Sequence, residues 1–140
     1  MKKEISLVTA KCIYHYVHGV AWVAYAVLTL FNNLICNILA VALLFICIVL
    51  SSFGLLSSNE PDDEMSRYNM MKAKARAMDF LKIVICIALI IIALLGVLDD
   101  FIPFLSANIH ISLSFAVALA LGVPDIIIGY LFAKYEKAGE

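Results

Sequence analysis

Residues 109–133 read IHISLSFAVALALGVPDIIIGYLFA, an apolar stretch long enough to cross a lipid bilayer as a helix. The only acid in this stretch is Asp125, which follows Pro124. A carboxylate in hydrocarbon is costly unless it is paired, hydrated or protonated, so Asp125 requires an explanation. Small residues line the same stretch in two neighbouring rows, Ser114, Ala118, Gly122 and Gly129 in one and Ser112, Ala116 and Ala120 in the other. Because residues three and four apart share a helix face, these rows predict close packing against another helix.

The composition of the chain indicates that its solvent is lipid. Of its 140 residues, 64% are hydrophobic and only 15% are charged. Water-soluble domains are usually about half apolar and about a quarter charged. The size and composition are typical of small prokaryotic membrane proteins, and neither a cofactor nor a metal-binding motif is evident. The four cysteines lie singly and are interpreted as small buried hydrophobes.

We predict an all-α integral membrane protein that forms one domain over residues 1–140. Its four transmembrane helices are expected at about 12–31, 34–56, 80–98 and 109–133. Asn32 and Asn33 separate the first two spans, since one helix through both would be far longer than a bilayer is thick. Strong helix formers over about 62–79 predict a cytoplasmic helical extension that leads into the third span. The alternating pattern of 109–123 also fits a strand, but a lone strand in lipid would leave its backbone groups without hydrogen bonds.

The basic residues predict the orientation of the chain. With four spans, all ten Lys and Arg residues fall on the side that carries both termini and the middle loop. Positive charge is enriched on the cytoplasmic side of membrane proteins. We therefore expect a multi-pass protein of the cell membrane with its N- and C-termini in the cytoplasm.

Asp125 is expected to pair with a side chain of the first span. Counted from the cytoplasmic ends of the two helices at about 1.5 Å per residue, His18, His15 and Tyr14 lie at a depth similar to that of Asp125. The candidate partners are therefore His18, His15, Tyr14 and Tyr16. Because histidine can change its charge between about pH 5 and 8, such a pair could respond to protons. Two alternatives remain: Asp125 is a hydrogen-bonding group that only holds helices together, or Pro124-Asp125 begins a displaced half-helix near water.

A second group of polar residues is expected at the outer ends of the helices. Its members are Asn33, Asn37, Asp99, Asp100, Asn108 and His110. They could converge on a cation, but their spacing matches no metal-ligand pattern, and solvated turn residues are the alternative. The sequence does not show whether the small rows of 109–133 pack on the first span or on a second copy of the chain.

No motif of an enzyme is present, and acids balance the bases of the middle loop, which disfavours nucleic-acid binding. The favoured function is that of a non-enzymatic interaction, accessory, regulatory or immunity-type membrane protein. Its expected partners are the lipid bilayer and a second copy or another membrane protein, contacted through the fourth span. The alternative is a small oligomeric transporter or channel with a proton- or cation-handling site at Asp125 and His18 or His15. A membrane-embedded enzyme is a more distant third hypothesis.

Overall fold

The computed structural model of the chain describes residues 6–31, 33–52, 63–95, 103 and 106–138. Within these residues the protein forms four long helices and no strand, so the predicted all-helical fold is confirmed. The helices are α1 (Leu7–Thr29), α2 (Leu34–Ser52), α3 (Glu64–Leu95) and α5 (Ile109–Ala138). In the described part of the chain, α3 and α5 are long and apolar enough to cross a membrane, and α2 has a shorter apolar part, Leu34–Cys47.

Two helix boundaries differ from the predicted ones. The prediction began the first helix at residue 12, but α1 begins at Leu7 because the Ser6 side chain accepts a hydrogen bond from the Thr9 N–H at 3.3 Å. The last helix continues beyond residue 133 to Ala138. Hydropathy marks the lipid-soluble part of a helix, whereas backbone hydrogen bonding continues into the polar flanks. The predicted ends at 53–56 and 96–98 lie outside the described residues.

Helices α3 and α5 are each continuous through the point at which the sequence suggested that one segment ends and another begins. The expected extension and the third apolar segment form the single helix α3, whose first turn is capped by Asp63, which accepts from the Ser66 N–H at 2.6 Å. Helix α5 runs through Pro124, so the interpretation of Pro124-Asp125 as the start of a separate half-helix is wrong. A proline inside a helix cannot donate to the carbonyl one turn earlier, and the surrounding packing has to compensate for that lost bond.

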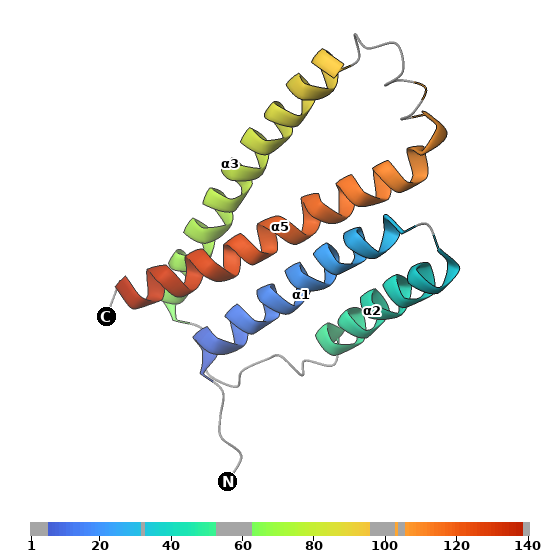
Figure 1. Cartoon of the computed structure of the whole chain (residues 1–140). Helices are drawn as coiled ribbons and strands as arrows, with labels where there is room; N and C mark the ends of the chain where they lie inside the picture. Colours follow the sequence, from blue (N-terminus) through green and yellow to red (C-terminus); the bar gives the residue numbers. More distant parts are fainter. Residues whose placement is uncertain (1–5, 32, 53–62, 96–102, 104–105, 139–140) are drawn as a thin grey trace.

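The helices lie in the order α3, α5, α1, α2 (Figure 1), and the contacts between them follow this order. The starts of α1 and α3 and the end of α5 meet at one end of the molecule (Figure 1). The main apolar core is located there, where Met70, Ala73 and Ala77 of α3 pack on Ile128 and Phe132 of α5, with Val8 and Cys12 of α1 alongside. We call this meeting point the three-helix junction.

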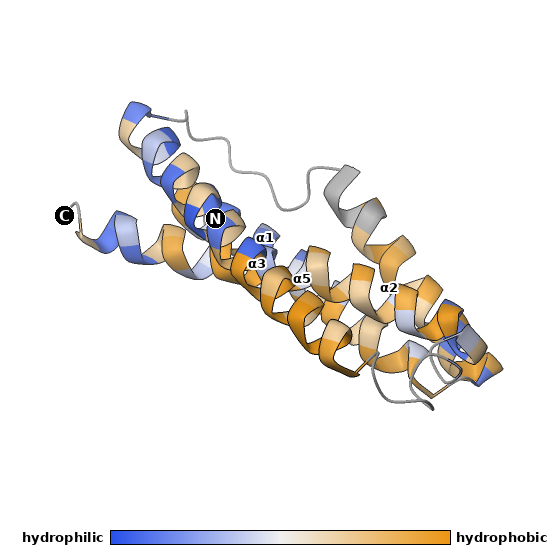
Figure 2. Ribbon diagram, turned by 90° about the horizontal axis from the view of Figure 1, so that it is seen from above, coloured by the Kyte–Doolittle hydropathy of each residue, from blue (hydrophilic) through white to orange (hydrophobic). Residues whose placement is uncertain are grey.

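Beyond the junction, α3 diverges from α5 (Figure 1). None of the most apolar part of α3 is buried within the described chain. Ile83 is 59% exposed and Leu94 is 68% exposed. Figure 2 shows that this exposed part of α3 is almost uniformly hydrophobic, whereas hydrophilic residues gather where α3 begins and α5 ends. An exposed apolar surface of this kind is typical of a region that contacts lipid or another protein.

Candidate functional site

The backbones of α1 and α5 come into direct contact at Gly19 and Gly122. A methyl group added to Gly19 would lie 2.7 Å from the Gly122 carbonyl oxygen, and one added to Gly122 would lie 2.8 Å from the Gly19 carbonyl oxygen. Any side chain larger than hydrogen would hold the two helices apart. Further along, the Cys12 thiol donates to the Gly129 carbonyl at 3.7 Å.

The first small row of α5 therefore faces α1 of the same chain. Gly122 and Gly129 contact α1, and Ala118 in the same row is fully buried. The second row is not equally enclosed, since Ala116 is exposed and Ser112 and Ala120 are half-buried. Close backbone approach thus uses one of the two rows that the sequence singled out.

This close approach brings His15 of α1 to Asp125 of α5. Nδ1 of His15 lies 3.0 Å from Oδ1 of Asp125, and the two side chains are 12% and 26% exposed. Asp125 follows Gly122 by about one helical turn, as His15 precedes Gly19 by about one turn, so the crossing of the backbones sets the distance between these two short side chains.

The other candidate partners of Asp125 occupy different places. Tyr14 stacks on His18 with ring centroids 4.6 Å apart, and its ring meets His15 edge-on at 5.4 Å. The ring of Tyr16 lies beside Gly129, since a methyl group added there would be 3.4 Å from it. The structure thus places His15 against Asp125 and links His18 to that pair through the ring of Tyr14.

The contact between His15 and Asp125 can be a hydrogen bond or an ion pair. Nδ1 donates to the carboxylate in the imidazolium form and in one neutral tautomer, while the imidazolium form makes an ion pair. A charge-assisted hydrogen bond of this kind is among the stronger polar contacts between helices. The described residues contain no group of three or more His, Cys, Asp or Glu side chains that could hold a metal ion.

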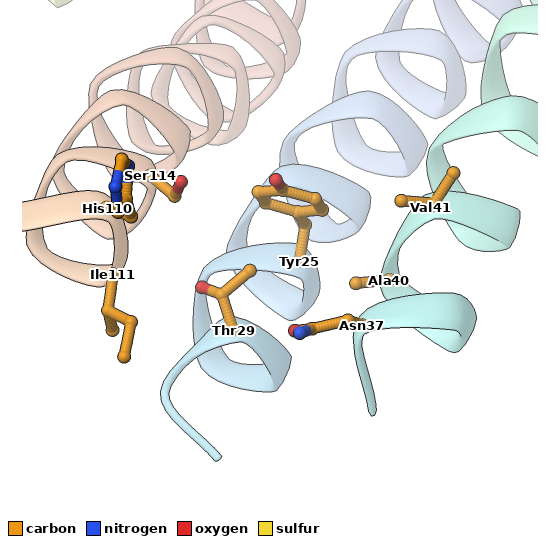
Figure 3. Close-up of a pocket in the computed structure, with 8 residues that line it drawn as sticks. All are labelled: Tyr25, Thr29, Asn37, Ala40, Val41, His110, Ile111 and Ser114. Carbon is orange, nitrogen blue, oxygen red and sulfur yellow. The ribbon is translucent and has the colours of Figure 1, made fainter. Parts of the chain in front are cut away.

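At the opposite end of the bundle, a pocket of about 230 Å³ lies among α1, α2 and α5 (Figure 3). Its lining residues include Tyr25, Thr29, Asn37, His110 and Ser114. Asn37 and His110 thus share a pocket, as the sequence suggested. Tyr25 and Thr29 were missed, although their four-residue spacing places them on one face of α1.

Among the described outer polar residues, Asn33 and Asn108 do not line this pocket. Asn33 caps α2, since its side chain accepts from the Ile35 N–H at 3.0 Å. Asn108 precedes α5, with its carbonyl accepting from the Ser112 N–H at 3.0 Å. Asp99 and Asp100 lie outside the described residues. A cation site built from the whole predicted group therefore has no support in the described residues.

Polar contacts at the three-helix junction were also missed from the sequence. Lys11 of α1 donates to the Ser66 hydroxyl of α3 at 3.3 Å, and its ammonium lies 5.6 Å from the ring centroid of Phe132. The Asn69 amide donates to Glu136 of α5 at 3.1 Å. The spacing of the small and polar residues could have indicated this contact surface. The residues of α3 that the structure buries follow one another mostly at three- and four-residue steps and so share one face: Ser66, Asn69, Met70, Ala73 and Ala77.

No protein-family model matches this sequence, and neither a characterised protein nor a solved structure is similar enough to match it. The functional assignment therefore rests on the chemistry and packing of the described residues.

Proposed function

We propose that the chain is a four-span protein of the cell membrane whose two termini lie in the cytoplasm. Helices α3 and α5 have the length and composition of membrane spans. Helix α1 lies against α5 and α2 lies against α1, so the same bilayer would enclose all four helices. The start of α1, the start of α3 and the end of α5 share one end of the bundle (Figure 1), and these segments carry Lys11, Arg67, Lys72, Lys74, Arg76, Lys134 and Lys137. The positive-inside rule supports a cytoplasmic location for that end.

Within this arrangement, we propose an interaction role of the accessory, regulatory or immunity type, with no reaction of its own. The observation that carries this proposal is the open flank of α3, defined as residues 80–95. Transmembrane helices associate by van der Waals packing along their length, as α1 and α5 do here. The open flank has no such neighbour among the described residues, because none of the most apolar part of α3 is buried. The row of small residues on α5 (Ser114, Ala118, Gly122 and Gly129) was a candidate surface for a partner protein, but it packs on α1 of the same chain. We therefore assign the partner surface to α3.

Cys86 makes this proposal testable, because it is exposed on the open flank and the interpretation of this cysteine as a buried hydrophobe is wrong. In membranes that contain a variant with Cys86 as its only cysteine, we expect copper-phenanthroline oxidation to give a disulfide-linked dimer in high yield. A second copy of the chain is the simplest partner with an exposed Cys86 at the same depth.

The matched control is a cysteine-free variant carrying Leu39→Cys, since Leu39 is 53% exposed on α2. This variant reports collisions between chains that diffuse in the same membrane. Equal dimer yields from the two positions would show that the open flank does not pair with a second copy and would contradict a self-association surface there.

A second candidate function is favoured by the His15–Asp125 pair. Buried ionisable groups inside a membrane often belong to proton or ion pathways. We propose as the alternative a small oligomeric transporter or channel in which this pair handles protons. On that reading, Asp125→Asn abolishes proton flux into liposomes measured with an entrapped pH dye, whereas Asn69→Ala, which loses a polar contact elsewhere, leaves the flux intact. Flux that is unaffected by Asp125→Asn contradicts the alternative.

The pair also has a structural contribution that can be measured separately. Hydrogen bonds between membrane helices contribute on average about 0.6 kcal/mol and at most about 1.7 kcal/mol, so we expect a coupling energy of about 1 kcal/mol between His15 and Asp125. A double-mutant cycle with His15→Ala and Asp125→Ala, followed through the fluorescence of Trp22 during unfolding in mixed micelles, measures this energy. Additive effects of the two changes would show that the 3.0 Å contact stabilises nothing.

A further inference from the structure

A pocket of about 410 Å³ lies between α1 and the first half of α3, beside the three-helix junction. Its lining residues are Lys11, His15, Arg67, Met70, Met71 and Lys74. Lys11 and His15 are four residues apart and share a face of α1, while the other four follow one another at three- and four-residue steps or as direct neighbours on α3. One face of α1 and one face of α3, both of which carry basic side chains, thus line the same pocket.

The lining is strongly cationic. Lys11, Arg67 and Lys74 are basic, His15 is paired with Asp125, and none of the described lining residues is acidic. Three of the described acids nearby have contacts elsewhere: Asp125 pairs with His15, Glu136 accepts from Asn69, and Asp63 caps α3. A lysine ammonium has three donors and a guanidinium has five, so each cation can serve an anion in addition to its contacts within the chain.

One of the cations is held in place by the fold. Lys11 donates to Ser66 and lies over the ring of Phe132, so its ammonium is anchored between α3 and α5. Met70 and Met71 supply an apolar wall next to the charged groups. A pocket with cations on one side and thioether side chains on the other matches a ligand that joins a phosphate to a hydrocarbon portion.

The position of the pocket along the proposed span points to the same ligand. Lys74 precedes the apolar residues that begin at Phe80 by roughly 9 Å of helix, calculated at 1.5 Å per residue, which is the depth of the headgroup region next to the hydrocarbon. Basic pockets at the cytoplasmic ends of transmembrane helices bind anionic lipid headgroups. We propose that this pocket binds the phosphate of an anionic phospholipid of the cytoplasmic leaflet, between α1 and α3.

The probe for this site is phosphatidylglycerol with eight-carbon chains, added to the full-length chain in detergent and counted by native mass spectrometry. The test variant is Arg67→Gln/Lys74→Gln, since both positions are exposed on α3 and Lys11 stays in place to hold the junction. Each basic group near a membrane surface contributes about a fivefold change in binding, so we expect the double variant to bind about 25-fold more weakly. An unchanged melting temperature would show that both proteins remain folded.

The matched control is Arg76→Gln, which removes a positive charge from an exposed residue of the same helix that does not line the pocket. We expect this variant to keep its affinity within about twofold, because screening by salt weakens charges outside the pocket. An equal loss per removed charge in Arg76→Gln would show a diffuse surface charge and would overturn the site.

Two further ligands distinguish the source of the phosphate. Phosphatidylcholine of the same chain length carries a compensating positive charge, and we expect it to bind more weakly than phosphatidylglycerol and to be insensitive to the double variant. Inorganic phosphate is expected to compete only weakly, because it cannot contact the methionine wall. Displacement of the lipid by low millimolar inorganic phosphate would assign the pocket to a soluble phosphate compound and would overturn the lipid proposal.

Discussion

Replacing Phe132 by alanine is expected to release the first half of α3 from α5. Phe132 is 0% exposed and is the largest fully buried side chain among the described residues. Ala73 and Ala77 of the same core cluster are also fully buried and too small to fill the space that the ring leaves, so only Met70 and Ile128 can fill part of it. Phe→Ala changes in cores cost about 3–5 kcal/mol, and we expect the lower end of that range because, in the proposed membrane arrangement, the separated helices would meet headgroups and lipid as well as water.

Hydrogen exchange gives the local measurement of this effect. Amides of residues 66–77 should exchange much faster in Phe132→Ala, while those of α1 around Gly19 should change little, because the contact of α1 with α5 there is independent of the ring. The matched control is Tyr130→Ala, which removes an aromatic side chain of α5 that is 57% exposed. Similar exchange in the two variants would show that the junction does not depend on the buried ring.

Replacing Gly19 by alanine is expected to separate α1 from α5. The added methyl group would meet three atoms at once, the Ile126 Cγ1 at 2.5 Å, the Gly122 carbonyl oxygen at 2.7 Å and the Ile126 backbone nitrogen at 2.8 Å. Two of these atoms belong to the backbone, which cannot move aside as a flexible side chain can. Overpacking costs about 1–3 kcal/mol, and we expect the upper end here, even after the gain of about 1 kcal/mol in helix propensity that alanine has over glycine.

Trp22 reports this separation because it lies beside the crossing. A methyl group added to Gly122 would lie 2.8 Å from the Trp22 Cβ, so the environment of the indole changes when the two helices move apart. We expect an altered emission maximum and a lower melting temperature in Gly19→Ala. The increased separation should also break the 3.0 Å contact of His15 with Asp125, so adding Asp125→Asn to Gly19→Ala should cost little more.

The control for this experiment is Gly129→Ala on α5. A methyl group at Gly129 would have its nearest neighbours at 3.4 Å, which is ordinary van der Waals contact. Since alanine is the better helix former, this variant should be as stable as the original chain or slightly more stable. If Gly19→Ala were tolerated as well as Gly129→Ala, direct backbone contact between α1 and α5 would be disproved.

Local sequence was sufficient to predict the helices and the part of α1 that lies level with Asp125. Apolar length marked α3 and α5 as segments able to cross a membrane, and the depth count brought His15, His18 and Tyr14 into the same layer as Asp125. The ends of the helices were predicted less accurately, because Ser6 caps α1 ahead of its apolar part and the last turns of α5 are helical without being apolar. The sequence could not choose among the candidate partners of Asp125, since each of them lies within about one turn of the others on α1.

The sequence by itself determined which segments are helical, because apolar runs and helix-forming residues act locally. It also determined that a carboxyl group, that of Asp125, lies within the apolar stretch 109–133. Only the tertiary structure decided that His15 meets Asp125, because that contact depends on where the backbones of Gly19 and Gly122 cross. The tertiary structure also placed the expected cytoplasmic extension against α5 and left residues 80–95 without a neighbour in the described chain. Spacing along a helix shows which residues share a face, whereas the rotation and separation of two packed helices determine what each face touches.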